Sequence, residues 1–227
     1  MRVSSILREI NTIRKVRKLE MSVCVNKMIV GPVRTNCYIV YQEGSDEAVI
    51  IDPGDDAFGI EYRLNTLKVK PTAILLTHGH FDHIGAVNTL KTHFEIEVYA
   101  YRDEKEILTT DMNLGRMMGE RIMVEADKYL TDGFEADIAG MKFKVIHTPG
   151  HTIGSCCYLL EDEKILFSGD TLFYHSHGRT DFPTGSQSAI IRSIVDKLLV
   201  LDDDIIVYPG HEEDTTIGSE KMIYDCY

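Results

Sequence analysis

The chain has 227 residues, 44% of them hydrophobic, which suits one large domain or two small ones with a packed core. It contains no run of about 18 apolar residues, so the sequence predicts no membrane-spanning helix. The formal net charge of −12 repels phosphate backbones, which argues against a nucleic-acid partner and favours metal cations and small molecules as ligands.

The first twenty residues differ from the rest of the chain. Apolar side chains from Val3 to Leu19 recur at helical spacing, and basic side chains fill many of the positions between them. The pattern predicts a basic amphipathic extension, residues 1–20, ahead of one domain at 21–227. The extension could be a targeting or membrane-surface segment, a helix that packs on the domain or a partner, or an upstream extension with Met21 as the true start. Glu9 and the lack of a continuous apolar region argue against a secretory signal.

Short apolar runs that end in glycine or proline follow from Val23 onward, and they predict β-strands. In chain order the main runs are "KMIVGP", "CYIVYQEG", "AVIIDPG", "AILLTHGH", "FKVIHTPGH", "SCCYLL", "KILFSGD" and "DIIVYPGH". Helices are predicted between them at 57–68, 83–93, 102–122 and 186–200. Adjacent strands combined with strand–helix units predict an α/β or α+β fold with mixed sheets.

Four of these predicted strands lead directly into a loop that carries histidine or aspartate. They end at Thr77, Ile146, Ser168 and Tyr208. Sheets of α/β proteins gather ligand-binding side chains at strand ends, because the strands hold the loops rigidly while the loops stay open to substrate.

The first of these loops, "THGHFDHIG", holds three histidines and one aspartate within six positions. His78 and His80 point to one side of an extended loop, while Asp82 and His83 fall where a helix begins. Neutral imidazole is the commonest metal-binding side chain and a carboxylate compensates the charge of a cation. The spacing therefore predicts a site for one or two metal ions.

Three later strand ends complete a set of seven candidate ligands by adding His151, Asp170 and His211. The first predicted group consists of His78, His80 and His151. The second consists of Asp82, His83 and His211. Asp170 is expected to bridge the two ions and to leave a position for water or hydroxide between them.

These motifs, "THGHFDHIG", "TPGHT", "SGDTLF" and "YPGH", resemble in their order those of the metallo-β-lactamase-fold hydrolase superfamily, over about residues 23–215. Three further stretches, "TNCYIV", "IDPG" and "GRTDFPTGS", are most similar to its glyoxalase II-like branch, the hydroxyacylglutathione hydrolase-like proteins. The resemblance implies a four-layer αβ/βα sandwich with the metal ions at one end of two facing sheets.

The resemblance also implies an enzyme that binds two divalent metal ions, zinc first, with iron or manganese as alternatives. A metal-activated hydroxide would attack the carbonyl of a small-molecule thioester or ester, because zinc lowers the pKa of bound water to about 7. Asp82 and Asp170 are the expected catalytic carboxylates, and Asp82 would also orient the nucleophile. Glyoxalase II proper carries a further helical region beyond the position of His211, so glutathione specificity is not carried over.

Other functions use part of the same residues. Persulfide dioxygenases of the superfamily also show "GRTDF" and hold a single iron, here at His78, His151 and Asp170. A metal-stabilised binding protein without catalysis is a third alternative, although purely structural zinc sites close at four ligands. The acidic net charge argues against a ribonuclease.

Residues of the "YHSHGRTDFP" stretch are candidates for substrate contact. Arg179 could pair with Asp181 or meet a substrate carboxylate through its planar donor fork. His177, with His175, is either a substrate contact or a surface residue. His147, by contrast, ends a strand and is expected to support the site or the core rather than to bind metal.

Five cysteines form an odd set without zinc-finger spacing, and they predict free thiols in a reducing compartment, with cytoplasm as the default location. Cys156 and Cys157 are adjacent in a predicted strand, so their side chains face opposite sides of it. The sequence does not define the oligomeric state.

Overall fold

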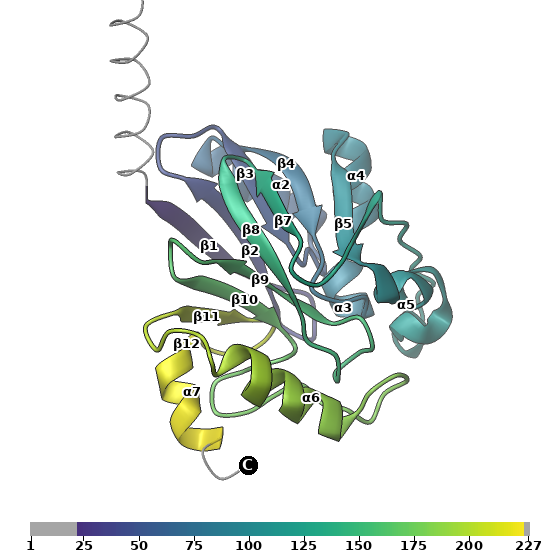
Figure 1. Cartoon of the computed structure of the whole chain (residues 1–227). Coiled ribbons are helices and arrows are strands. Elements are labelled where there is room, and N and C mark those ends of the chain that lie inside the picture. Colours follow the sequence, from purple (N-terminus) through teal and green to yellow (C-terminus); the bar gives the residue numbers. More distant parts are fainter. Residues whose placement is uncertain (1–21, 225–227) are drawn as a thin grey trace, which may run out of the picture.

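The structure is a computed structural model that describes residues 22–224, so the extension predicted at 1–20 lies outside the described residues. Two six-stranded sheets face each other, and helices cover the outer face of each (Figure 1). The predicted four-layer αβ/βα sandwich with mixed sheets is confirmed. Within the described part of the chain, no helix is long and apolar enough to cross a bilayer.

The first sheet has the strand order β1-β2-β3-β4-β5-β6. Its strands are β1 (Val23–Val30), β2 (Thr35–Gln42), β3 (Glu47–Ile51), β4 (Lys70–Leu75), β5 (Glu97–Tyr101) and β6 (Lys128–Leu130). The first three pair antiparallel and the last four pair parallel, with β3 common to both sets. Parallel strands need long crossovers, and the helices α2 (Ala57–Leu67) and α4 (Val87–Phe94) lie in two of them.

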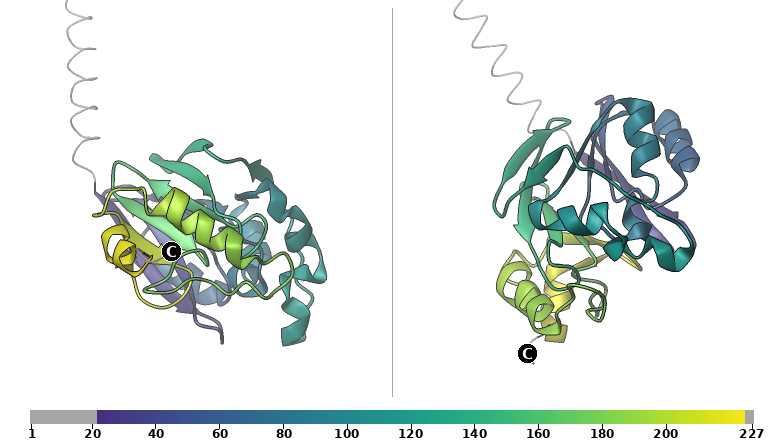
Figure 2. Two further views of the ribbon diagram at one scale, coloured as in Figure 1. Left: turned by 60° about the horizontal axis from the view of Figure 1, so that its bottom comes forward. Right: turned by 90° about the vertical axis from the view of Figure 1, so that its right-hand side faces the viewer.

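The second sheet has the strand order β12-β11-β10-β9-β8-β7. Its strands are β7 (Glu135–Ile138), β8 (Met141–His147), β9 (Cys156–Leu160), β10 (Ile165–Gly169), β11 (Ile206–Pro209) and β12 (Thr215–Thr216). Only β10 and β11 pair parallel here. The helix α6 (Gln187–Ser193) lies in the crossover between them, continues as a π-helix (Ile194–Leu198), and packs with α7 (Ile217–Tyr224) on the outer face of this sheet (Figure 2).

Side-chain alternation along the strands builds the layers. In β2, Tyr38 and Val40 belong to the core between the sheets, whereas Cys37 and Ile39 face the helices α2 and α4. The successive cysteines of β9 divide in the same way, with Cys156 in the central core and Cys157 beneath α6. Cys37, Cys156 and Cys157 are buried free thiols, as predicted.

Two predicted helices differ from the structure. The stretch 83–93 is two helices, α3 (Phe81–Ile84) and α4, because the chain turns at Gly85 and the Ala86 N–H bonds the carbonyl oxygen of Pro53.

The predicted helix at 102–122 is wrong. Short turns replace it: η1 (Arg102–Glu104), α5 (Lys105–Thr109), η2 (Asp111–Asn113) and η3 (Gly115–Met118). Thr110 is extended, and Leu114 and Gly119 have φ of 67° and 80°, which no continuous right-handed helix accommodates.

Candidate metal centre

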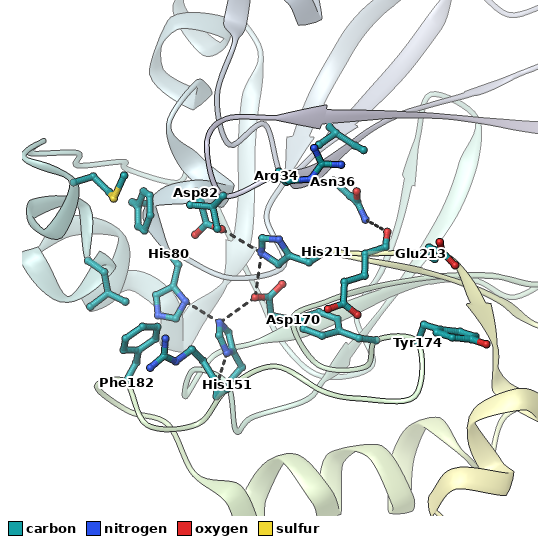
Figure 3. A pocket seen from close by; sticks show the side chains of 18 of the residues that line it. Arg34, Asn36, His80, Asp82, His151, Asp170, Tyr174, Phe182, His211 and Glu213 are labelled. Carbon is teal, nitrogen blue, oxygen red and sulfur yellow. Dashed lines mark hydrogen bonds and ion pairs between the residues drawn. The ribbon is translucent and has the colours of Figure 1, made fainter.

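Seven side chains from four strand ends meet at one end of the two facing sheets (Figure 3). The loop after β4 carries His78 and His80, and α3 begins directly after it. Asp82 and His83 belong to the single turn of α3. The remaining three residues, His151, Asp170 and His211, follow the ends of β8, β10 and β11. The structure therefore brings together every side chain predicted to bind metal.

The first group is His78, His80 and His151, all at most 3% exposed. One ligand nitrogen from each lies within 4.8 Å of the others. His80 Nδ1 and His151 Nε2 are 2.8 Å apart, and the three rings stand nearly perpendicular to one another. Three imidazoles that converge in this way offer the nitrogen donors of a zinc-type site.

The second group is Asp82, His83 and His211, whose ligand atoms also lie within 4.8 Å of one another. His211 Nε2 is 3.2 Å and His83 Nε2 is 3.6 Å from Asp82 Oδ2. A carboxylate replaces one of the imidazoles here, so this group offers an anionic oxygen donor, whereas the first group offers only nitrogen donors.

Asp170 lies between the groups. Its Oδ2 is 3.4 Å from His151 Nε2 and 3.6 Å from His211 Nε2, while its Oδ1 is 3.4 Å from His83 Nε2. A carboxylate in this position can offer one oxygen to each of two cations, which is the geometry expected of a bridging ligand.

In three of the rings, Nδ1 points away from the centre and donates a hydrogen bond, which leaves Nε2 without a hydrogen. His151 Nδ1 donates to the Arg179 carbonyl oxygen at 2.7 Å, and His83 Nδ1 donates to Asp52 Oδ2 at 2.9 Å. The Thr77 hydroxyl donates to Asp52, so it accepts from His78 Nδ1 at 3.2 Å. Each neutral ring then has its lone pair on Nε2, the atom that faces the centre.

The unsatisfied atoms of the site test whether a metal fits. Within residues 22–224, His78 Nε2, His83 Nε2 and Asp170 Oδ1 are buried and have no hydrogen-bond partner. A buried polar atom without a partner costs about 1–3 kcal/mol, and several that converge on one place are explained by a bound cation. The donor set therefore fits divalent metal ions.

The pKa values of the first group favour neutral rings. Burial lowers the pKa of His78 and His151 below the ordinary value, and it lowers the pKa of His80 to about 3. Neighbouring histidines act in the same direction on all three. Neutral imidazole is the form that binds a metal, so these rings are ready to bind at neutral pH.

The pKa values of the two histidines in the second group are raised instead. Burial alone would lower the pKa of His83, but the surrounding carboxylates, led by Asp170, outweigh burial and raise it well above the ordinary value. The pKa of His211 is raised for the same reason. Burial would raise the pKa of Asp82, but His83 and His211 hold it at about 2.

Asp52 is a further residue beside the site, and the sequence patterns did not indicate it. It follows β3, is 2% exposed, and accepts hydrogen bonds from the Thr77 amide at 2.8 Å, the Thr77 hydroxyl at 2.6 Å and His83 Nδ1. Through Thr77 it also reaches His78. Because both of its oxygens are engaged by protein donors, Asp52 orients one histidine of each group rather than acting as a ligand.

Two glycines let the loops close around the centre. A Cβ atom on Gly210 would lie 2.1 Å from Asp170 Oδ1 and 2.8 Å from His83 Cε1, so no side chain fits there. A Cβ atom on Gly54 would lie 1.5 Å from the Asp82 carbonyl oxygen. Both positions require glycine because of close approach.

The candidate substrate residues lie in different places. Arg179 lines the pocket, but its guanidinium forms two hydrogen bonds of 2.6 Å with Asp181 and lies 3.9 Å from the centre of the Phe182 ring. His177 lies outside the lining of the pocket, with Nδ1 2.9 Å from the Tyr224 hydroxyl. The expectation that His177 contacts substrate is therefore not supported by its geometry.

Two other histidines lie away from the ligand groups. His175 stacks on Tyr174 and lies outside the pocket lining, like His177. His147 stacks on Tyr101 at 4.1 Å, and its Nε2 lies 2.9 Å from the Ile153 carbonyl oxygen.

A pocket of about 1070 Å³ lies over the site, and five of the seven residues line it: His80, Asp82, His151, Asp170 and His211. Figure 3 shows Arg34 and Phe182 on opposite sides of the histidine–aspartate cluster. Besides Phe182, the apolar residues Leu114 and Met117 also line the pocket. Among the described residues, no side-chain hydrogen bond or ion pair engages the guanidinium of Arg34, so a cation is free at the other side.

Comparisons with known proteins place the chain among metallo-hydrolases. A model of the family described as "Metallo-beta-lactamase superfamily" matches residues 30–211. The chain is 38% identical over 193 residues to "Hydroxyacylglutathione hydrolase GloC" of Haemophilus influenzae, covering 82% of this chain and 89% of that protein. It is 35% identical over 199 residues to "Probable metallo-hydrolase YqgX" of Bacillus subtilis, covering 86% and 93%.

Three solved structures resemble this chain over 86–88% of its length. The BLEG-1 B3 metallo-beta-lactamase has a TM-score of 0.83 and 41% identity, over 88% of this chain and 97% of that one. TTHA1623 in a di-iron-bound form has a TM-score of 0.78 and 35% identity, over 86% and 96%. ETHE1 from Myxococcus xanthus has a TM-score of 0.75 and 28% identity, over 88% and 83%. The family match contains all seven candidate ligands.

Proposed function

This chain belongs to the metallo-beta-lactamase superfamily, and from that premise we propose that it is a metal-dependent hydrolase that cleaves a small-molecule thioester. The family and the groups of histidine and aspartate imply divalent metal ions. The observation that carries the proposal is the convergence of buried, unsatisfied Nε2 atoms and the Asp170 carboxylate beneath an open pocket. Similarity to the hydroxyacylglutathione hydrolase supports a thioester as substrate.

The two groups define where the ions would be held. The first ion would be bound by His78, His80 and His151, the second by Asp82, His83 and His211, and Asp170 would contact both. When bound, such ions polarise a carbonyl oxygen and lower the pKa of water. Zinc suits this donor set, and the similarity to a di-iron protein keeps iron as an alternative.

Asp82 has a role beyond binding a metal ion. Its pKa of about 2 keeps it ionised, and the Thr35 hydroxyl donates to its Oδ2 at 2.9 Å, which fixes the orientation of the carboxylate. Because Asp82 also lines the pocket, it can accept a hydrogen bond from a water molecule and direct it toward the substrate carbonyl. No serine or cysteine nucleophile is needed for this reaction.

The pocket supports a substrate with two unlike ends. The apolar lining residues Leu114, Met117 and Phe182 suit one arm of a thioester. The guanidinium of Arg34, which no side chain within residues 22–224 engages, suits an anionic group on the other arm. Arg179 is less suited to that contact because Asp181 already occupies its donor fork. We therefore assign recognition of an anionic group to Arg34.

The test is turnover of a panel of thioesters, esters and lactones by the zinc-loaded chain, compared with His80→Ala. Loss of a metal-binding nitrogen should lower kcat/KM by at least about 100-fold. His93→Ala is the matched control, because His93 is exposed at the end of α4 and contacts Glu61, away from the pocket. Full thioesterase activity of the metal-loaded His80→Ala variant would contradict the proposal.

One observation favours a second candidate, an iron-dependent persulfide dioxygenase. The "GRTDF" loop lies directly against the site, since the Arg179 carbonyl oxygen accepts a hydrogen bond from His151. A mononuclear oxygenase would use His78, His151 and Asp170. One iron per chain and oxygen uptake with glutathione persulfide would favour this candidate, whereas two ions per chain without oxygen uptake favour hydrolysis.

A further inference from the structure

We propose that Glu104 is a positioning residue that holds together the two loops carrying His78, His80 and His151, and so sets the metal affinity of this group. The inference rests on the proposed metal-dependent function but concerns binding rather than turnover. Glu104 lies at the end of η1, beyond β5, and belongs to neither ligand loop.

The burial of Glu104 needs a reason. Its side chain is fully buried at 0% exposure, and within residues 22–224 no lysine, arginine or histidine forms a salt bridge with it. A buried carboxylate without a cation costs free energy, so this residue is a poor choice for stabilising a core. Burial accordingly raises the pKa of Glu104 to about 7, although hydrogen bonds from Thr152 and two backbone amides oppose that shift.

Both oxygens of Glu104 accept hydrogen bonds, each from a different ligand loop. Oε2 accepts from the Gly79 amide at 2.8 Å, and Gly79 is the residue between His78 and His80. Oε1 accepts from the Gly154 amide at 2.8 Å and from the hydroxyl of Thr152, the neighbour of His151. One carboxylate therefore links the loop after β4 in the first sheet to the loop after β8 in the second.

Both loops approach Glu104 closely at a glycine. A Cβ atom on Gly154 would lie 2.6 Å from the Glu104 backbone nitrogen and 2.8 Å from Oε1. A Cβ atom on Gly79 would lie 3.0 Å from Oε2. Both loops thus have glycine where they meet the carboxylate, which leaves their amides within hydrogen-bond distance.

The hydrogen bonds of Glu104 hold the two loops at a fixed distance, and this distance sets the spacing of the ligand atoms. His80 Nδ1 and His151 Nε2 come from the two loops and lie 2.8 Å apart, so a shift of either loop changes the distance that a metal ion must span. Zinc–nitrogen distances are about 2.0–2.1 Å, which leaves little tolerance for such a shift. Residues that orient ligands in this way typically change metal affinity 10- to 100-fold when mutated.

The test is the Glu104→Gln variant of the full chain. Glutamine keeps the shape, but its NH2 group faces an N–H or O–H donor of one loop, so that loop loses its acceptor. We expect the affinity for the first Zn²⁺ ion to fall about 10- to 100-fold. The measurement is equilibrium competition with a chromophoric chelator, with the number of bound ions counted by native mass spectrometry.

The matched control is Glu220→Gln. Glu220 is also 0% exposed, and its oxygens accept hydrogen bonds from the Thr215 hydroxyl and the His175 amide, away from both ligand loops. Its zinc affinity should stay within about twofold of wild type, although the loss in stability should be similar. Equal losses of affinity in both variants would show a general effect of disturbing the core and would overturn the inference.

A second pair of variants locates the effect. In a His78→Ala background, which removes the first site, Glu104→Gln should cause no further loss of affinity for the remaining ion. A further tenfold loss there would overturn the inference. Thr152→Val removes only one of the three hydrogen-bond donors to Glu104, so it should produce a smaller loss of zinc affinity at the same site. It replaces Glu104→Gln in the test if that variant does not fold.

The outcomes separate the two proposals. Wild-type protein that takes up no transition-metal ion would overturn the proposed function and this inference with it. Wild-type protein that binds zinc no more tightly than Glu104→Gln would overturn the inference alone and leave the proposed hydrolase intact.

Discussion

Asp52→Asn is expected to weaken both the fold and the metal site. Asp52 accepts three hydrogen bonds at 2.6–2.9 Å while 2% exposed. Asparagine retains one acceptor oxygen and turns an NH2 group toward donors on Thr77 or His83, so at least one bond is lost. Hydrogen bonds to a charged group contribute about 1.5–3 kcal/mol each, and the buried donor left unpaired adds to the loss. We expect the free energy of unfolding to fall by about 3 kcal/mol.

The assay is urea unfolding of the metal-free protein, in which the midpoint should fall while the slope stays constant. Asp46→Asn is the surface control, because its side chain is exposed, and it should change stability by less than about 0.5 kcal/mol. Zinc affinity should also fall about 10- to 100-fold at both sites, because Asp52 orients one histidine of each group. A loss below about 1 kcal/mol together with unchanged zinc affinity would refute this reasoning.

Three further predictions follow from the site. In the metal-free protein, His83 and His211 have raised pKa values, so their protonated forms stabilise the fold. This stabilisation is complete below pH 6.5 and is lost as the pH rises through the raised pKa values. Asp82, with a pKa of about 2, contributes stability above pH 3.8 that is lost as the pH falls toward 2, and urea unfolding from pH 2 to about 9 measures both trends. Arg34→Gln should raise KM about tenfold for a thioester with an anionic arm and leave kcat unchanged, and an equal effect on a neutral thioester would argue against the assignment. Gly210→Ala places a methyl group 2.1 Å from Asp170 Oδ1, so this carboxylate must shift, and metal analysis of the folded fraction should find fewer than two ions per chain. Two ions per chain in that fraction would contradict this expectation.

Four of the candidate ligands could be predicted from the sequence because they follow one rule, and the other three lie in the same short motif as His78. His151, Asp170 and His211 follow apolar strands directly, as His78 does, and strands of facing sheets end at the same edge. Asp52 obeys the same rule in "IDPG", so that signal was present in the sequence. Its oxygens accept hydrogen bonds from Thr77 and His83, so the structure was needed to separate Asp52 from the candidate ligands.

Glu104 and the broken segment around it could not be predicted in the same way. The stretch from 102 to 122 has helical composition, but tertiary packing and two residues with positive φ divide it into short turns. The role of Glu104 arises only where Gly79 and Gly154, 75 residues apart in number, meet the same carboxylate. Local patterns do not record such an approach.

Anomalous diffraction from crystals of the zinc-loaded protein would show whether two ions bind at this centre. We expect two peaks, one among His78, His80 and His151 and the other among Asp82, His83 and His211, each about 2.0–2.2 Å from its ligand atoms with Asp170 in contact with both. A single peak held only by His78, His151 and Asp170, or no peak at either group, would contradict a site for two metal ions.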